Sequence, residues 1–118
     1  MKTLVATFAV LAFAGLVGVS VWATGHQSIA VPIRDLIADP AGGNNPWLVA
    51  TLFDAYFGFL WFWLWVAYKE SSWLARGVWL VLILLTGNMA MAVYVLIQLW
   101  RLPAGAGAEQ LLLRRTPR

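Results

Sequence analysis

The chain has 118 residues, of which 62% are apolar and only 11% are charged, a composition far from that of a water-soluble domain. The formal charge of +3 comes mostly from arginines near the C-terminus, and no basic segment interleaved with aromatic residues predicts nucleic-acid binding. Cysteine is absent and histidine occurs once, which excludes disulfides, thiolate nucleophiles and a multi-histidine metal site within one chain. The composition predicts an integral membrane protein of the all-α class.

Three nearly uncharged apolar runs predict three transmembrane helices, over about residues 3–24, 47–69 and 73–101. At about 1.5 Å per residue, each run is long enough to cross a hydrocarbon core of about 30 Å. The short connection at 70–72 makes the second and third helices an antiparallel hairpin, with a serine as the N-cap of the third helix. Residues 1–102 form one predicted domain, and residues 103–118 are predicted to be a flexible basic tail.

The first run begins after Lys2 and also has the outline of a secretory signal, with the small residue Ala23 at the cleavage position. Its apolar region is longer than the roughly 7 to 15 residues of a signal core. We therefore interpret it as a retained anchor, with a cleaved signal as the alternative.

The segment between the first two helices contains three prolines and Gly42-Gly43-Asn44-Asn45, which are turn-forming residues. Within it, residues 31–38 are predicted to form a short helix with Ile33, Leu36 and Ile37 on one face. Such a helix would lie on the membrane surface. The alternative is that the segment is an ordered loop that rests on the neighbouring helices. Pro46 suits the first turn of the second helix.

The eight tryptophans are expected at the two membrane interfaces, because indole prefers that depth. One group consists of Trp22, Trp47 and Trp100, and the other of Trp61, Trp63, Trp65, Trp73 and Trp79. The dense cluster of Trp61, Trp63 and Trp65 is a candidate contact for a pigment, a quinone or a partner helix, with plain anchoring as the alternative. His26 is a candidate ligand of haem or chlorophyll. No cofactor is predicted beyond these open contacts.

Two cues to membrane orientation conflict. Lys2, Lys69 and Arg76 mark one predicted side, whereas the other side carries five arginines, Arg34, Arg101, Arg114, Arg115 and Arg118. The first helix usually dominates the orientation of a membrane protein, so we favour a cytoplasmic N-terminus, in a bacterial inner membrane.

Asp54 lies about two turns inside the second helix, where an ionised carboxylate is costly without a partner or water. If the turn is centred near residue 71, residue x of the second helix faces residue 142 − x of the third. Asp54 then faces Asn88, whose amide can donate to the carboxylate. The pair fixes the register of the hairpin in one interpretation, and it relays protons or binds an ion or ligand in the other.

Small residues surround this predicted pair and would let the helices approach closely. They are Ala14, Gly15 and Gly18 on the first helix, Ala55 and Gly58 on the second, and Gly87 and Ala92 on the third. The sequence thus predicts a narrow polar layer where all three helices meet.

Several stretches resemble a known family, most specifically DAYFGF, the turn YKESSWLAR and GNMAMAVY, together with VWAT at the end of the first helix. The chain is similar there to a family of small three-helix membrane proteins known only as a domain of unknown function. The resemblance covers about residues 1–102, whereas the GGNN loop and the arginine tail look peculiar to this chain. It implies the three-span architecture and no activity.

Our first functional hypothesis is a non-catalytic accessory subunit that packs against a larger membrane complex, such as an electron-transport or photosynthetic assembly. The alternative is a small homo-oligomeric binding or transport protein that uses Asp54. The expected partners are membrane lipids and other membrane subunits or further copies of the chain. An enzyme is not expected, because the sequence contains no nucleophile with a base, no metal cluster and no phosphate-binding glycine loop.

Overall fold

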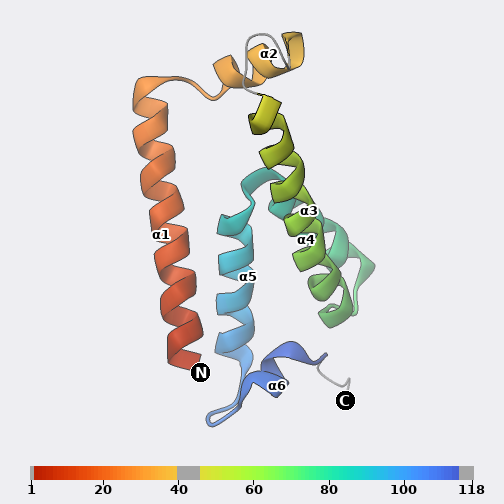
Figure 1. Cartoon of the computed structure of the whole chain (residues 1–118). Helices are drawn as coiled ribbons and strands as arrows, with labels where there is room; N and C mark the ends of the chain where they lie inside the picture. The colour runs from red at the N-terminus through yellow and green to blue at the C-terminus, as the bar shows by residue number, and fades with distance from the viewer. Residues whose placement is uncertain (1, 40–45, 115–118) are drawn as a thin grey trace.

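A computed structural model describes residues 2–39 and 46–114, a part of the chain that forms six helices and no strand (Figure 1). The helices are α1 Lys2–His26, α2 Ala30–Ala38, α3 Pro46–Lys69, α4 Trp73–Thr86, α5 Asn88–Arg101 and α6 Ala108–Leu112. The all-α prediction is confirmed, as is the short helix before the second long one. The Gly42–Asn45 loop, Arg115 and Arg118 lie outside the described residues.

In the described part, α1 and α3 are the two helices that are long and apolar enough to cross a membrane. They have 25 and 24 residues and agree with the first two predicted helices within two residues at each end. Pro46 opens α3, where its missing N–H leaves no intrahelical hydrogen bond unmade. Long apolar runs bounded by polar residues were therefore sufficient to predict both helices.

The third predicted helix, over 73–101, is not continuous. It consists of α4 and α5, each of 14 residues, separated at Gly87. The backbone of Gly87 has φ 59° and ψ −123°, a conformation that a residue with a Cβ rarely adopts. A Cβ at this position would also lie 2.7 Å from Cζ of Phe59. The prediction of one helix was wrong because a glycine inside an apolar run is compatible with a helix until tertiary contacts select another conformation.

At Gly87 the chain reverses direction, so that α5 runs back along α4. The Tyr94 hydroxyl donates a hydrogen bond of 2.9 Å to Oε2 of Glu70, 24 residues earlier in the turn before α4. A straight helix would separate two such residues by about 36 Å. The rings of Trp79 and Tyr94 are 4.9 Å apart, and buried Ile83 and Ala90 belong to the same cluster. The two short helices therefore form a hairpin of their own, with Gly87 at its tip (Figure 1).

The predicted antiparallel packing of α3 against α4 is confirmed, and its register agrees with the prediction within two or three residues. The Tyr56 hydroxyl donates to the carbonyl of Leu84 at 3.2 Å, and Nε1 of Trp63 donates to the carbonyl of Arg76 at 2.9 Å. The Ser72 side chain accepts from the backbone N–H at the third position of α4, as an N-cap does.

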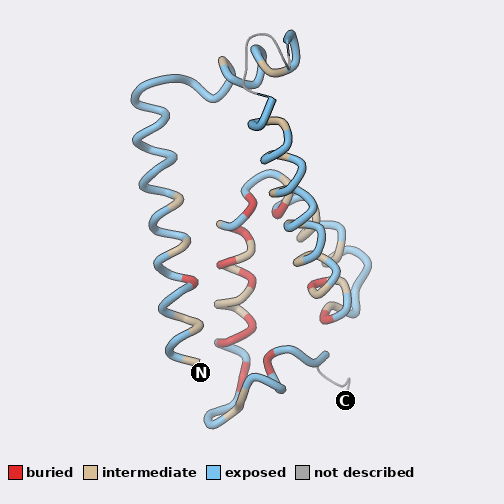
Figure 2. Tube along the Cα trace, viewed as in Figure 1, coloured by how far each residue is buried: buried red, intermediate tan, exposed pale blue. Residues whose placement is uncertain are grey.

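Burial is concentrated on α5 and on the ends of α3 and α6, whereas most of α1 and the first half of α3 are exposed (Figure 2). The main cluster contains Val66, Ile83, Ala90 and Tyr94, with aromatic rings of α3 and α4 packed around it. α1 lies along α5, where Ala9 and Ala92 are buried. The core thus lies where the α4–α5 hairpin meets α3, and α1 covers the outer side of α5.

The segment after α5 was expected to be a flexible tail, but its described part folds back onto α3. Leu111 of α6 is buried together with Leu99 and Leu102. The Lys69 ammonium donates to the backbone carbonyls of Leu111 and Leu113, and Nε1 of Trp65 donates to that of Leu112 at 3.0 Å. These contacts involve backbone carbonyls, which side-chain patterns in a sequence do not predict.

Candidate functional site

Two regions of the molecule are candidates for function, and the reversal at Gly87 creates both. The open end comprises residues 13–26 of α1 and 46–58 of α3, which extend past the tip of the α4–α5 hairpin and are mostly exposed. The basic end lies at the other extreme of the 54 Å long molecule and contains the 70–72 turn, α6 and the start of α1.

The predicted polar pair is not formed. Asp54 and Asn88 are both exposed, and no hydrogen bond joins them in the part of the chain that the structure describes. Asn88 lies beside Phe8 and Ala12 of α1 instead. The register of α3 against α4 was correct up to the glycine, but the reversal there turns the first residue of α5 toward α1.

The small residues divide into those that pack and those that do not. Ala92 is buried against α1, and Gly87 is buried under Phe59. Gly15, Gly18 and Gly58 have open space where a side chain would be, and Ala14 is exposed, with Ala55 half-buried. α1 packs through Val5, Ala9 and Ala12 rather than through the predicted Ala14–Gly18 face, because α5 covers only the first half of α1. The predicted meeting of three helices around Asp54 and Asn88 therefore does not occur.

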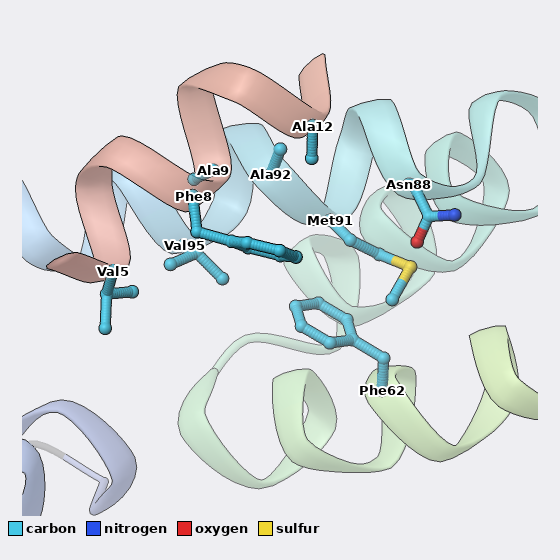
Figure 3. A pocket seen from close by; sticks show the side chains of 9 residues that line it. All are labelled: Val5, Phe8, Ala9, Ala12, Phe62, Asn88, Met91, Ala92 and Val95. Atoms are coloured by element: carbon cyan, nitrogen blue, oxygen red, sulfur yellow. The ribbon is translucent and has the colours of Figure 1, made fainter. Parts of the chain in front are cut away.

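A narrow cleft of about 180 Å³ lies between α1, α5 and α3 (Figure 3). Phe8 and Phe62 approach each other across it, and the Asn88 amide at its edge is its one polar side chain. Pockets that enclose a drug-sized ligand have volumes of about 300–1,000 Å³. The cleft is therefore too small to enclose a quinone or a pigment, and its chemistry suits a few methylene groups of a lipid chain.

The tryptophan cluster has mostly internal contacts. Trp63 donates to Arg76, and the ring of Trp65 packs edge-on against Tyr94 at 5.5 Å, whereas Trp61 is 74% exposed. His26 ends α1, where its Nδ1 donates to the carbonyl of Trp22 at 2.9 Å. Among residues 2–39 and 46–114, no group of three His, Asp or Glu side chains could hold a metal ion.

The grouping of the tryptophans at the two ends of the molecule also differs from the prediction. Trp100 ends α5 and therefore lies at the basic end, not with Trp22 and Trp47. The straight helix expected over 73–101 would have carried Trp100 to the opposite end.

The basic end is held by hydrogen bonds that sequence patterns did not predict. Nζ of Lys2 donates to the carbonyl of Leu102, and Arg114 donates to the backbone carbonyl of Tyr68 and stacks on its ring. Lys69 is only 8% exposed, the one buried charged side chain among the described residues. These contacts join the start of α1 to the end of α5, and the segment after α6 to the end of α3.

Fold and site define the chain as a small all-helical protein in which α1 and α3 have the length and composition of membrane-crossing helices. The chain belongs to a family described as "Protein of unknown function (DUF1475)", which matches residues 25–115. This confirms the resemblance to an uncharacterised family, but the match begins at the end of α1 and includes the GGNN loop and the C-terminal segment through Arg115. No match is found among curated proteins or among solved structures.

Proposed function

We propose that this protein is an integral membrane protein that acts as a non-catalytic accessory subunit, packing its open end against helices of a partner complex. The observation that carries the proposal is the exposure of apolar α1 and α3 beyond the hairpin tip, together with the exposed carboxylate of Asp54 among them. An acid at that depth faces lipid unless another chain covers it, which is costly.

The helix lengths support the membrane arrangement. α1 and α3 reach about 36 Å and cross a hydrocarbon core of about 30 Å, whereas α4 and α5 reach about 21 Å each. The α4–α5 hairpin therefore enters the membrane and leaves on the same side. The predicted third crossing is replaced by this half-length hairpin.

The hairpin tip supplies a second argument for a partner. The first backbone N–H groups of α5 have no intrahelical acceptor, as in any helix, and no side chain caps them. Irregular backbone at membrane depth is tolerated where protein or a water-filled cavity surrounds it. A partner helix between α1 and α3 with hydrogen-bonding side chains could accept from the first N–H groups of α5 and donate to the Asp54 carboxylate.

Native purification from membranes tests this function. We expect co-migration with a larger complex at fixed stoichiometry, weakened by Asp54→Leu and retained by Asp54→Asn, since an amide still forms hydrogen bonds. Recovery of the native protein as a monomer without other subunits would refute the proposal.

The alternative is a homo-oligomer in which further copies cover the open end. It is favoured by Gly15, Gly18 and Gly58, which leave room for another helix to approach each of the two exposed helices. In that case the purified native species is a discrete multimer of this chain alone, and Asp54→Leu dissociates it. The mass of the purified species in detergent distinguishes a multimer of this chain from a complex with other subunits.

A further inference from the structure

Positive charge is distributed very unequally between the two ends of the molecule. Of the six Lys and Arg side chains in the described residues, five lie at the basic end: Lys2, Lys69, Arg76, Arg101 and Arg114. Two carboxylates, Glu70 and Glu109, accompany them. At the opposite end, Arg34 is outnumbered by Asp35 and Asp39.

The fold, not the order of residues along the chain, creates this asymmetry. The reversal at Gly87 returns Arg101 to the end where the hairpin began, and the Lys2–Leu102 hydrogen bond brings the start of α1 to the same place. The docking of α6 on Lys69 and Trp65 adds Arg114. A straight helix over 73–101 would have separated Arg101 from Arg76 by about 38 Å and carried Arg114 away with it.

Several of these cations keep donors free to bind a ligand. Arg101 is exposed and makes no hydrogen bond within residues 2–39 and 46–114. Arg76 donates through Nε to the carbonyl of Ala67 at 2.8 Å, which leaves its terminal nitrogens without a partner among the described residues. Its guanidinium lies 4.5 Å from the ring of Trp73. Lys69, by contrast, is buried on the carbonyls of the α6 segment and serves the fold.

Exposed indoles accompany the free cations. Trp73 and Trp100 are 80% and 85% exposed; the Trp73 ring lies against the Arg76 guanidinium, and Trp100 precedes Arg101 at the end of α5. Indole prefers the depth of lipid headgroups, and a guanidinium binds a phosphate through two parallel hydrogen bonds. The combination of a tryptophan and an arginine at one end of an apolar bundle therefore matches a phospholipid headgroup.

We propose that the basic end binds the headgroups of anionic phospholipids and faces the cytoplasm. This inference rests on the membrane placement proposed above. Anionic leaflets attract basic segments next to the membrane, and Lys and Arg in short connections are retained on the cytoplasmic side. The orientation cues that conflict along the sequence agree once the fold gathers the cations.

Native mass spectrometry of the full chain in neutral detergent tests the inference, with equal amounts of phosphatidylglycerol and phosphatidylcholine as probes. The wild type binds phosphatidylglycerol preferentially. Each change, Arg101→Gln and Arg76→Gln, lowers that preference about fivefold, the effect of one cation near an anionic surface. Arg34→Gln, at the acidic opposite end, is the matched control and changes it less than twofold.

The charge-conserving variant Arg76→Lys/Arg101→Lys separates binding from folding, because it removes the same two side chains and keeps their charge. We expect it to retain most of the preference. The inference would be overturned if the double variant Arg76→Gln/Arg101→Gln preferred phosphatidylglycerol as strongly as the wild type does. It would also be overturned if Arg34→Gln lost as much of that preference as the basic-end variants do. Extraction of the protein from membranes by alkaline carbonate would overturn the membrane placement itself, whereas retention without lipid preference would overturn this inference alone.

Discussion

Replacing Gly87 with alanine tests the chain reversal that organises the whole structure. Alanine at φ 59° and ψ −123° is strained by about 1–3 kcal/mol. Its Cβ would lie 2.7 Å from Cζ of Phe59, and overpacking of this kind costs about 1–3 kcal/mol more. The expected loss, about 2–6 kcal/mol, is a large fraction of the 5–15 kcal/mol by which a small protein is stable.

Thermal unfolding in detergent measures the loss, and Gly77→Ala is its control. Gly77 lies within α4, where an added Cβ meets no atom within 4 Å. We expect that variant to be as stable as the wild type or more stable by about 1 kcal/mol, since alanine favours a helix over glycine. When Phe59 is also replaced with leucine, the contribution from the contact between the alanine Cβ and Phe59 should disappear. The contribution from the strained backbone should remain.

Cysteine labelling adds a topological measurement, because the chain has no cysteine of its own. Single cysteines at Gln27, Ser71 and Ala104 are treated in oriented membrane vesicles with a maleimide that does not cross the membrane. The hairpin places Ser71 and Ala104 on one side and Gln27 on the other. Gly87→Ala, which favours a continuous helix over 73–101, should move some of the Ala104 signal to the side of Gln27. Labelling of Ala104 with Gln27 in the wild type would refute the reversal.

Two further substitutions test the contacts that hold the basic end. Tyr94→Phe removes the hydroxyl that donates to Glu70 and should lower the free energy of unfolding by about 1.5–3 kcal/mol, measured by thermal or denaturant unfolding; an unchanged stability would show that this hydrogen bond does not hold the hairpin. Lys69→Met removes the donor to the α6 carbonyls, so amide hydrogen exchange over 108–113 should accelerate at least tenfold while α3 stays protected, and unaltered exchange there would contradict the docking of α6 on Lys69.

The parts of the fold that could be predicted from the sequence are those set by local composition. α1 and α3 follow from apolar runs of membrane-crossing length, and α2 from the spacing of Ile33 and Ile37. The short 70–72 turn predicted Tyr56 at the depth of Thr86, two residues from Leu84, to which its hydroxyl donates. In each case the neighbours in sequence determine the outcome, and no distant contact has to be known.

The parts that could not be predicted depend on contacts between distant residues. A glycine such as Gly87 is common in apolar helices, and only the approach of Phe59 and the docking of α5 onto α1 and α4 select its unusual backbone. The contacts of Lys69 also could not be predicted, because they are made with residues distant in sequence and a lysine at the end of an apolar run is usually an interfacial anchor. Here it is buried by a segment more than forty residues later in the chain.

The chain reversal at Gly87 accounts both for the exposure of Asp54 and for the position of most Lys and Arg side chains at the basic end. A continuous helix over 73–101 would have covered the upper half of α3 and brought Asn88 to Asp54, leaving the cations divided between both ends. By turning back at Gly87, the chain uses α5 to build a core around Tyr94 and to return Arg101 to the basic end, but it leaves Asp54 exposed. In the membrane placement that we propose, an uncovered acid is costly, and for this reason we propose that another chain covers the open end. If the hairpin and a partner are coupled in this way, the Asp54→Leu and Gly87→Ala variants should weaken the same complex. The first removes the contact, and the second favours a continuous helix over 73–101, which would lie in the space that the partner fills.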